Sequence, residues 1–296
     1  NEYVSEGWGV YAQDLVQVAP EWKILGGLRY DSMTGDYDTF TAATGVKTGS
    51  YRMKISEWSK RFGVLYQPSD LQSFHFSYGT SFNTSGEAYS LGAANVNTPP
   101  ESSENIELGA RIDSADKKFT TRVALFKSTK KHERNTDPLQ PGITVLTGKR
   151  HAAGIDMDIS GYITPQWEVF GSYMWMPVAK IDIGAQGSEG EGQRPSLTPK
   201  HSGTVWTSYQ ITPQLRVGGG LNFRSKQTPN RNPGFYAPSY VTADLMAEYA
   251  IEVDRIILKA NLSNVSNKLF ADSLYANGHY TPGAGRLFQV SAKFKF

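Results

Sequence analysis

The stretch VTADLMAEYAI, residues 241–251, alternates between apolar and polar side chains and decides the fold class. Leu245 and Tyr249 share one face of an extended chain with further apolar residues, while Asp244 and Glu248 share the opposite face. Successive side chains of a β-strand point to opposite sides of its sheet. This stretch is therefore predicted to be a strand with one apolar and one polar face.

The same period of two runs through the whole chain, and helical periodicity is nearly absent. It recurs at residues 105–113, at 256–263 and in the final stretch that ends at Phe294 and Phe296. We predict an all-β fold of thirteen strands. Their expected ranges are residues 5–18, 22–32, 56–67, 71–81, 102–112, 118–128, 147–161, 166–176, 200–210, 214–224, 239–250, 255–264 and 285–296.

The predicted connections alternate between short and long. Short ones are expected at residues 20–21, 68–70, 114–117, 164–165, 212–213 and 252–254, and long ones at 33–55, 82–101, 129–146, 177–199, 225–238 and 265–284. Tight turns at one end and large loops at the other, joined by strands of about ten residues, are typical of a transmembrane antiparallel up-and-down β-barrel. Trp22 is expected near a turn end and Trp58 near a loop end, as in the two aromatic girdles of such a barrel.

Composition excludes several classes. The 296 residues carry 30 Lys plus Arg against 28 Asp plus Glu, which gives no concentrated basic charge for nucleic acid. No Cys is present, so disulfides and thiolate chemistry are excluded. No run of 18 apolar residues occurs, so the sequence predicts no transmembrane helix. The first residues do not resemble a signal peptide.

A soluble β-sandwich or propeller is the alternative architecture. It would explain the alternation but not the long loops at one end only. Charged residues of the polar face, such as Glu107, Arg111, Asp244 and Lys259, would need partners in a dry core, whereas a wet or plugged lumen solvates them. The barrel is therefore favoured.

Thirteen strands cannot close an antiparallel barrel without a parallel seam, and open edges in lipid are costly. Either strands are missed, or the chain is the C-terminal part of a larger barrel. We expect the second, because the chain starts in what reads as the middle of a strand and ends on Phe296, which resembles the signal read by bacterial barrel-assembly machinery.

Four passages resemble the TonB-dependent outer-membrane receptors of the ferric-siderophore type. Residues 8–14 are similar to the family's Gly-x-Tyr-x-Gln-Asp strand, and residues 100–111 to its Pro-Glu-x-Ser-x-Asn-x-Glu-x-Gly-x-Lys segment, with Arg111 in place of Lys. Residues 264–272 resemble its Asn-(Val/Leu)-x-Asn-Lys-x-Tyr box, and residues 278–286 its Tyr-x-Pro-Gly-x-x-Arg passage. The four passages occur in the family's order along nearly the whole chain.

The resemblance implies a bacterial outer-membrane protein with a 22-stranded barrel, of which residues 1–296 would be the C-terminal part. It implies uptake of a ferric siderophore of the catecholate or hydroxamate type, driven by TonB through an N-terminal plug region that this chain lacks. Expected partners are therefore the ferric siderophore, the TonB complex, outer-membrane lipid, lipopolysaccharide and the barrel-assembly machinery, with Phe294 and Phe296 as the assembly signal. No built-in cofactor or metal is expected, because iron would arrive inside the ligand.

A ferric siderophore needs cationic and aromatic groups where the loops meet the lumen. The loop candidates are Arg194, Arg231, Tyr236, Tyr275, His279 and Tyr280, and each of them could equally be a solvated loop residue or an interfacial aromatic. Residues 130–134 form a charge cluster that either contacts lipopolysaccharide phosphates or is solvated.

Three other functions remain as alternatives. A passive porin-like channel would share the barrel but not the four passages. A haem receptor of the same family would carry an Arg-Ala-Pro-type loop, and the corresponding residues 80–84 lack that pattern. An outer-membrane lipase would need a Ser beside a His on the lipid face. His151 has the right parity, but Ser172 of the next strand lies on the inner side, so we expect no enzyme activity. The five His residues form no ligand pair at i,i+2 or i,i+4.

Overall fold

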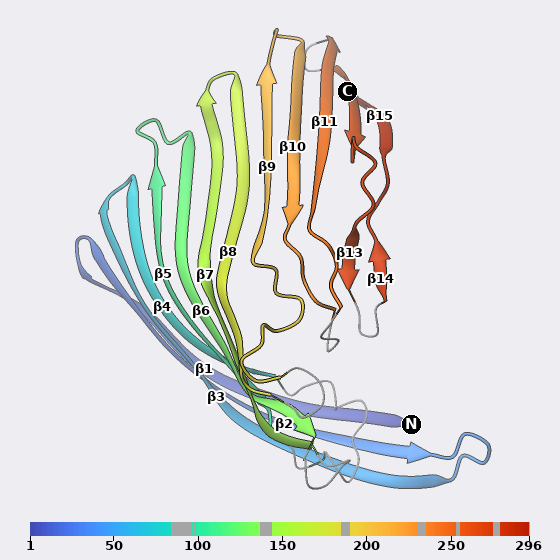
Figure 1. Cartoon of the computed structure of the whole chain (residues 1–296). Helices are drawn as coiled ribbons and strands as arrows, with labels where there is room; N and C mark the ends of the chain where they lie inside the picture. The colour runs from blue at the N-terminus through green and yellow to red at the C-terminus, as the bar shows by residue number, and fades with distance from the viewer. Residues whose placement is uncertain are drawn as a thin grey trace.

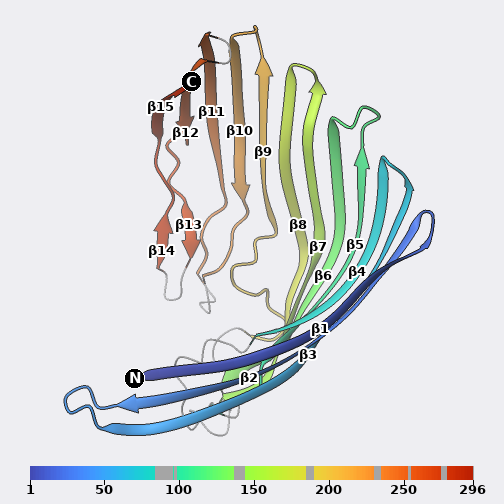
Figure 2. The same cartoon turned by 180° about the vertical axis from the view of Figure 1, so that it is seen from behind.

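The computed structural model describes residues 1–83, 96, 99–136, 144–184, 190–229, 235–252, 255–274 and 279–295, and for 134–136 and 144–147 it describes the backbone alone. Thirteen strands form one antiparallel sheet, which Figures 1 and 2 show curved like part of a barrel wall. The strands are β1 Glu2–Ala19, β2 Trp22–Phe40, β3 Lys47–Ser69, β4 Gln72–Asn83, β5 Glu101–Asp113, β6 Phe119–Thr136, β7 Thr144–Thr164, β8 Trp167–Ile183, β9 His201–Gln210, β10 Leu215–Arg224, β11 Tyr240–Glu252, β12 Ile256–Ser263 and β15 Leu287–Phe294.

Each strand pairs with the next one along the chain, in the order β1 to β12 and then β15. The predicted all-β class and the thirteen antiparallel strands are thus confirmed. In the part of the chain that the structure describes, no helix is long and apolar enough to cross a membrane.

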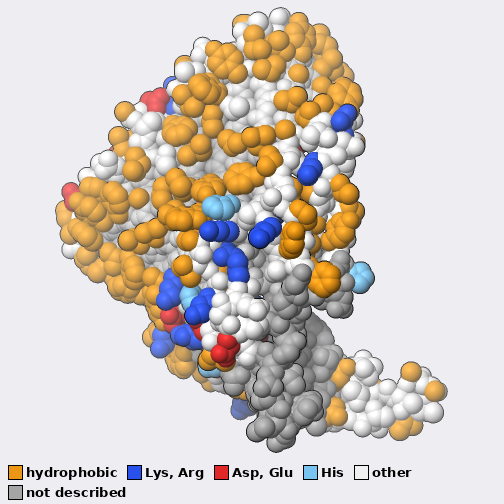
Figure 3. Space-filling model, viewed as in Figure 1, with side chains coloured by type: hydrophobic (Ala, Val, Ile, Leu, Met, Phe, Trp, Pro, Cys, Tyr) orange, Lys and Arg blue, Asp and Glu red, His pale blue; other side chains and the backbone are white. Residues whose placement is uncertain are grey.

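Register separates the side chains into the two predicted faces. Leu245 lies opposite Leu262, which in turn lies opposite Phe288, and these residues line an apolar groove on one face. Asp244 of the same strand lines a polar groove on the other face. Figure 3 shows hydrophobic side chains covering most of the upper part of the face seen in Figure 1. We call this apolar side the outer face and the polar side the inner face.

Aromatic rings gather at two heights of the first strands. Tyr30 lies between Trp8 and Trp58, with ring centroids 5.4 and 5.0 Å away, midway along β1, β2 and β3. At the turn end Trp22 stacks on Tyr66 at 4.5 Å, as predicted for Trp22. Trp58 does not lie near a loop end as predicted, because β3 begins at Lys47, well before the predicted start of this strand. Two such bands of amphipathic rings suit the two membrane–water interfaces.

Several strands are longer than the sequence predicted. The expected loop 33–55 is mostly strand, because β2 continues to Phe40 and β3 begins at Lys47, and strand also extends into 129–146 and 177–199 through β6, β7 and β8. These loop assignments were wrong at their edges. Beyond the bilayer both faces of a strand are wet, so the sequence keeps no apolar alternation there to mark the strand.

The last long connection holds a second sheet that the sequence did not predict. Strands β13 Ala271–Leu274 and β14 Tyr280–Pro282 pair antiparallel within the expected loop 265–284. A hairpin this short carries too little period-two pattern to be recognised from sequence. It lies at the loop end, below β11, β12 and β15 in Figure 1.

Candidate functional site

A chain of hydrogen bonds crosses the inner face at the loop ends of β9 to β12. The Thr204 hydroxyl donates to Oδ1 of Asn222 at 2.8 Å, and Nδ2 of Asn222 donates to Oδ2 of Asp244 at 3.1 Å. The backbone N–H of Asn264 donates to the other carboxylate oxygen of Asp244 at 2.7 Å. Both oxygens of Asp244 are therefore used to hold neighbouring strands in register.

Asn264 organises the connection after β12. It is buried and has a φ of 47°, a left-handed conformation that Asn tolerates better than most residues. Its Nδ2 donates to the carbonyl oxygens of Lys268 and Ala284, both at 2.9 Å. Asn267, with a φ of 51°, accepts the backbone N–H of Arg286 at 2.9 Å. The two Asn residues thus tie the start of the connection to its end.

The β13–β14 hairpin is fixed to the wall by a cation and two rings. Nη1 of Arg224 donates to the carbonyl oxygen of Asp272 at 3.1 Å, and the guanidinium lies 5.9 Å from the ring centroid of Tyr240. Tyr240 lies 4.4 Å from Phe270, centroid to centroid. A Cβ at Gly283 would overlap the ring of Phe270, so this close approach requires glycine.

These groups line one polar groove of about 660 Å³ on the inner face, which we call the lumenal groove. Its lining combines carboxylates, amides, hydroxyls, one Arg and aromatic rings. Such a surface suits a polar ligand or a polar segment of protein better than a lipid chain. The lining residues are Asp156, Asp158, Ser172, Met174, Ser202, Gly203, Thr204, Asn222, Phe223, Arg224, Tyr240, Thr242, Asp244, Ser263, Asn264, Phe270, Asp272, Ala284 and Gly285.

Arg194, a predicted ligand residue, holds a loop to the edge of the sheet. Its Nε donates to the Thr198 carbonyl at 2.7 Å and its Nη2 to the Met176 carbonyl at 2.7 Å, with longer bonds to the carbonyls of Pro177 and Pro199. Burial lowers the pKa of the Arg194 guanidinium. These contacts give Arg194 a loop-positioning role, and ligand contact by Arg194 stays a prediction.

The contacts of Arg194 coincide with a β-bulge. Met176 and Pro177 of β8 lie opposite Gly154 alone, between the pairs Ile155–Trp175 and Ala153–Val178. Proline has no N–H to give to the ladder and is tolerated at bulges. The guanidinium donates to the carbonyls of both bulge residues, Met176 and Pro177.

The other predicted ligand residues do not meet at one point. Tyr236 is exposed beside Lys226, whose Nζ lies 5.7 Å from the ring centroid, and Tyr280 is half exposed on β14 next to His279. None of Arg194, Tyr236, His279 and Tyr280 lines the lumenal groove. Arg231, Tyr275 and Phe296 lie outside the described residues. The ligand roles of all these residues stay predictions.

The sequence did not single out Arg224, Tyr240 or Asn222 as site residues. Arg224 and Asn222 share the parity of the polar face, and that parity was the available signal. Asp244 was recognised as an inner-face residue, and Asn264 as part of a motif, but neither was placed in a groove. These residues come together only because the β13–β14 hairpin folds back against the wall. The periodicity of the sequence does not predict that fold-back.

Further ion pairs follow the inner face away from the groove. Arg216 bonds Glu168 and also donates to the buried Ser208 hydroxyl through Nε at 3.0 Å. Nε2 of His75 lies 2.7 Å from Oε1 of the inner-face residue Glu107. Among the described residues, no three His, Asp or Glu side chains are grouped so that they could hold a metal ion.

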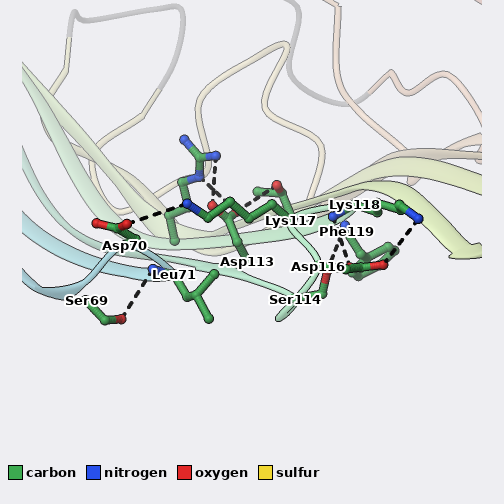
Figure 4. Close-up of polar contacts among 11 residues, drawn as sticks. Ser69, Asp70, Leu71, Asp113, Ser114, Asp116, Lys117, Lys118 and Phe119 are labelled. Atoms are coloured by element: carbon green, nitrogen blue, oxygen red, sulfur yellow. Dashed lines mark hydrogen bonds and ion pairs between the residues drawn. The ribbon is translucent and has the colours of Figure 1, made fainter.

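The turn end of the wall carries its own polar network, shown in Figure 4. Between β5 and β6, Asp116 accepts the Ser114 hydroxyl at 2.6 Å and the Lys118 N–H at 3.2 Å. These hydrogen bonds, led by that from Ser114, hold the pKa of Asp116 below its ordinary value. Nζ of Lys117 reaches Asp70 of the neighbouring turn at 3.7 Å. Adjacent short turns are thus linked to each other.

His151, the candidate base of a barrel enzyme, is bonded to a carboxylate. Its Nδ1 lies 2.8 Å from Oδ2 of Asp182. Ser172 pairs in register with Asp158 and lines the lumenal groove, on the face opposite His151. Ser172 is therefore not placed beside this pair.

The curved sheet, its apolar outer face and its polar inner face define the wall of an outer-membrane β-barrel with a wet or filled lumen. The family model "TonB dependent receptor-like, beta-barrel" matches residues 1–265. The chain belongs to this family, whose members are outer-membrane receptors and transporters and not enzymes. The predicted family, localisation and absence of enzyme activity are confirmed.

Similar proteins agree with this assignment. The "Probable TonB-dependent siderophore receptor PiuA" of Acinetobacter baumannii is 25% identical over 306 residues, which cover 98% of this chain and 41% of that protein. The "Catecholate siderophore receptor Fiu" of Escherichia coli K12 is 24% identical over 326 residues, covering 99% of this chain and 42% of Fiu. The chain spans about two fifths of the length of these relatives.

The fold is also that of solved structures. The crystal structure of the siderophore receptor PiuA from Acinetobacter baumannii superposes with a TM-score of 0.89 at 24% identity, covering 98% of this chain and 43% of that one. At this identity the superposition supports the fold alone. It confirms that a thirteen-stranded curved wall of this shape occurs within a TonB-dependent barrel.

Proposed function

We propose that residues 1–296 form the C-terminal part of the barrel of a longer receptor, and that this receptor takes up a ferric siderophore of the catecholate or hydroxamate type. The similarity to PiuA and Fiu over nearly the whole chain supports a siderophore as ligand. Iron would enter as part of the ligand, so the barrel needs no resident metal. TonB would supply the energy through an N-terminal region outside these residues.

The observation that carries the proposal is the composition of the lumenal groove near the loops. Arg224 lies over the ring of Tyr240, and Phe270 packs beside that ring. Guanidinium and aromatic groups match the negative charge and the flat rims of an iron chelate. The predicted residues Arg194, Arg231, Tyr236, Tyr275, His279 and Tyr280 belong to the long connections of the sequence and would complete the contact surface.

Ligand titration of the full-length receptor tests this function. The ferric complex of 2,3-dihydroxybenzoate represents catecholates and a ferric trihydroxamate represents hydroxamates, with quenching of Trp and Tyr fluorescence as the readout. We expect saturable binding of at least one probe, weakened about tenfold or more by Arg224→Gln or Tyr280→Ala. Arg255→Gln is the matched control, since Arg255 pairs with Glu252 at the turn end. Failure of both ferric probes to bind would contradict the siderophore assignment.

Two substitutions of Arg194 must be compared for ligand binding, because its guanidinium also holds the loop in place. Arg194→Lys keeps the charge but loses the fork that serves several carbonyls at once. Weakening by both Arg194→Ala and Arg194→Lys would indicate loop positioning, whereas retained binding in Arg194→Lys alone would indicate a charge contact with the ligand. Unchanged binding for Arg194→Ala and for Tyr280→Ala would remove both residues from the site.

Energised uptake is distinguished from passive flow in cells. We expect uptake of the radiolabelled ferric ligand to stop in cells lacking TonB. Uptake that continues at the same rate without TonB would favour the porin-like channel. We further propose that outer-membrane lipid covers the outer face, and that the barrel-assembly machinery reads Phe294 and Phe296 at the end of the chain.

A further inference from the structure

The two ends of the lumenal groove carry opposite charge. Asp156 and Asp158 of β7 line one end, and Arg224 of β10 lines the other. Strands β7 to β10 lie side by side in Figure 1, and Asp156 and Arg224 belong to one lateral row that runs through Met174 and Ser202. Three strand spacings of about 4.8 Å separate the two backbones, a distance of about 14 Å along the wall.

The carboxylates at the β7 end of the groove have no cation. Neither Asp156 nor Asp158 forms an ion pair with any described residue. The lateral neighbours of Asp156 are Ala124 and Met174, which carry no charge. Arg122 lies opposite Asp158 in the ladder, but these two described residues form no ion pair, and Arg122 does not line the groove. Two like charges on the same face repel each other, so this end of the groove favours a cation from outside the wall.

The other carboxylates of the groove are already engaged. Asp244 accepts a hydrogen bond through each of its oxygens and links neighbouring segments of the wall. Asp272 lies beside Arg224, which donates to its carbonyl oxygen at 3.1 Å. Among the described lining residues, the pair on β7 therefore carries the negative charge that is neither next to a cation nor used to link strands.

A buried hydroxyl in the groove also lacks a partner. Thr242 of β11 lines the groove and is only 6% exposed, and its hydroxyl forms no hydrogen bond with any described residue. Buried hydroxyl groups in proteins are hydrogen-bonded in the great majority of cases, and an unpaired one costs free energy. Thr242 lies opposite Asn222 in the ladder, and the Asn222 amide is already bonded on both sides. The missing partner of Thr242 is therefore expected within the groove, at the end that holds Arg224.

We infer that the lumenal groove binds a ferric siderophore that carries a protonated amine, with the amine at Asp156 and Asp158 and the iron chelate beside Arg224. Carboxylates form strong charge-assisted hydrogen bonds with an ammonium group, and the Thr242 hydroxyl would bond an oxygen of the chelate. Side chains reach into the groove from both ends, so a chelate with a flexible aminoalkyl arm spans the distance between them.

This inference rests on the proposed function and narrows its ligand. A hydroxamate with a free amine fits the groove, because its ferric chelate is neutral and an alkyl amine is protonated at neutral pH. A ferric tris-catecholate is strongly anionic, and the carboxylates on β7 would repel it. The groove therefore favours the amine-bearing hydroxamate over the catecholate.

The test compares two ferric probes on the full-length receptor. One is the ferric complex of desferrioxamine B, a linear trihydroxamate that ends in a primary amine, and the other is the same complex after N-acetylation of that amine. Acetylation removes the positive charge and leaves the iron chelate unchanged. With fluorescence quenching as the readout, we expect the parent to bind the amine form about tenfold or more tightly than the acetylated form. The preference should decrease as the salt concentration rises.

Three variants locate the contacts. Asp156→Asn combined with Asp158→Asn should bind both forms only as tightly as the parent binds the acetylated form. Glu57→Gln removes a carboxylate from the inner face of β3, outside the groove, and should keep the preference of the parent. Thr242→Val should weaken both forms by the same factor, about fivefold, because the hydroxyl contacts the chelate and not the amine.

Equal binding of the two forms by the parent would overturn the inference, and so would a preference that survives in the double variant. Binding of a ferric catecholate alone would overturn it as well, whereas failure of every ferric probe would contradict the proposed function itself. Unchanged affinity of Thr242→Val for both forms would remove the buried hydroxyl from the contact. The comparison of the two forms on the parent needs no variant, so it decides the question even if the double variant does not fold.

Discussion

The backbone N–H of Asn264 donates a 2.7 Å hydrogen bond to Oδ1 of Asp244, and this bond joins the residue after β12 to the loop-side part of β11 on the inner face. The same carboxylate accepts Nδ2 of Asn222 through its second oxygen. One side chain thus links β10, β11 and the start of the last long connection. The first prediction follows from this arrangement.

Asp244→Ala should loosen the last connection without unfolding the wall. It leaves the Asn264 N–H and the Asn222 amide without their acceptor, and hydrogen bonds to charged groups contribute about 1.5–3 kcal/mol. Hydrogen exchange in residues 264–274 and 279–286 should accelerate by at least about tenfold, while β1 to β4 stay protected. Glu248→Ala, on the inner face of the same strand, is the control, and equal effects of the two changes would refute a specific role for Asp244.

Leu258→Arg tests the orientation of the two faces. Leu258 lies on the outer face of β12, and an Arg at the mid-bilayer lipid surface of a barrel costs about 2–4 kcal/mol. The variant should fold in lower yield into lipid vesicles. Asn261→Arg places the same side chain on the inner face of the same strand and should fold like the parent. The reverse ranking would show that the faces are assigned the wrong way round.

Asp116→Asn should weaken the turn between β5 and β6 in a pH-dependent way. Because the pKa of Asp116 is lower in the folded protein than its ordinary value of 3.8, its charge stabilises the fold above that value. This contribution is lost as the pH falls through the lowered folded pKa. The melting temperature of the variant should therefore lie below that of the parent at pH 7, and the difference should shrink as the pH falls below 3.8.

Asp70→Asn is the control for Asp116→Asn in these measurements of melting temperature against pH. The Asp70 side chain is 92% exposed and pairs with Lys117 only at 3.7 Å, so its removal should change the melting temperature little at any pH. A difference between Asp116→Asn and the parent that stays constant from pH 7 to pH 2 would exclude the charged hydrogen bonds as its cause.

Gly283→Ala should disturb the β13–β14 hairpin. The added methyl group would overlap the Phe270 ring and displace it from Tyr240, so the lumenal groove should lose its shape near Arg224. Ligand affinity in the full-length receptor is expected to fall at least fivefold. At Gly26 nothing lies within 4 Å of an added Cβ, so Gly26→Ala is the matched control. Full affinity in Gly283→Ala would exclude the hairpin from the binding surface.

Deletion of Phe296 should impair assembly of the receptor in the outer membrane. The alternating apolar residues of β15, including the exposed Phe294, are proposed to form a signal with the terminal ring. The amount of folded receptor at the cell surface should drop several-fold, and Phe294→Ser should act in the same direction. Lys295→Gln is expected to be neutral. Normal surface levels after the deletion would contradict the signal.

The sequence by itself determined the strands that cross the bilayer and the face on which each side chain lies. In residues 241–251 a period of two is enough, because lipid and lumen impose opposite polarity on alternate residues. The short turns and the turn-end position of Trp22 were predictable for the same reason. The family passages could be recognised because they are local in sequence.

Only the tertiary structure decided how the loop side is built. The outer ends of β2, β3, β6, β7 and β8, the bulge at Pro177 and the β13–β14 hairpin lie where both faces are wet, and no polarity pattern marks them. Arg194 anchors its loop because the carbonyls of Met176 and Pro177 lie within reach of its guanidinium. Arg224 meets Asp272, 48 residues away, because the hairpin folds back. Contacts between distant segments depend on shape and packing, which residue spacing does not encode.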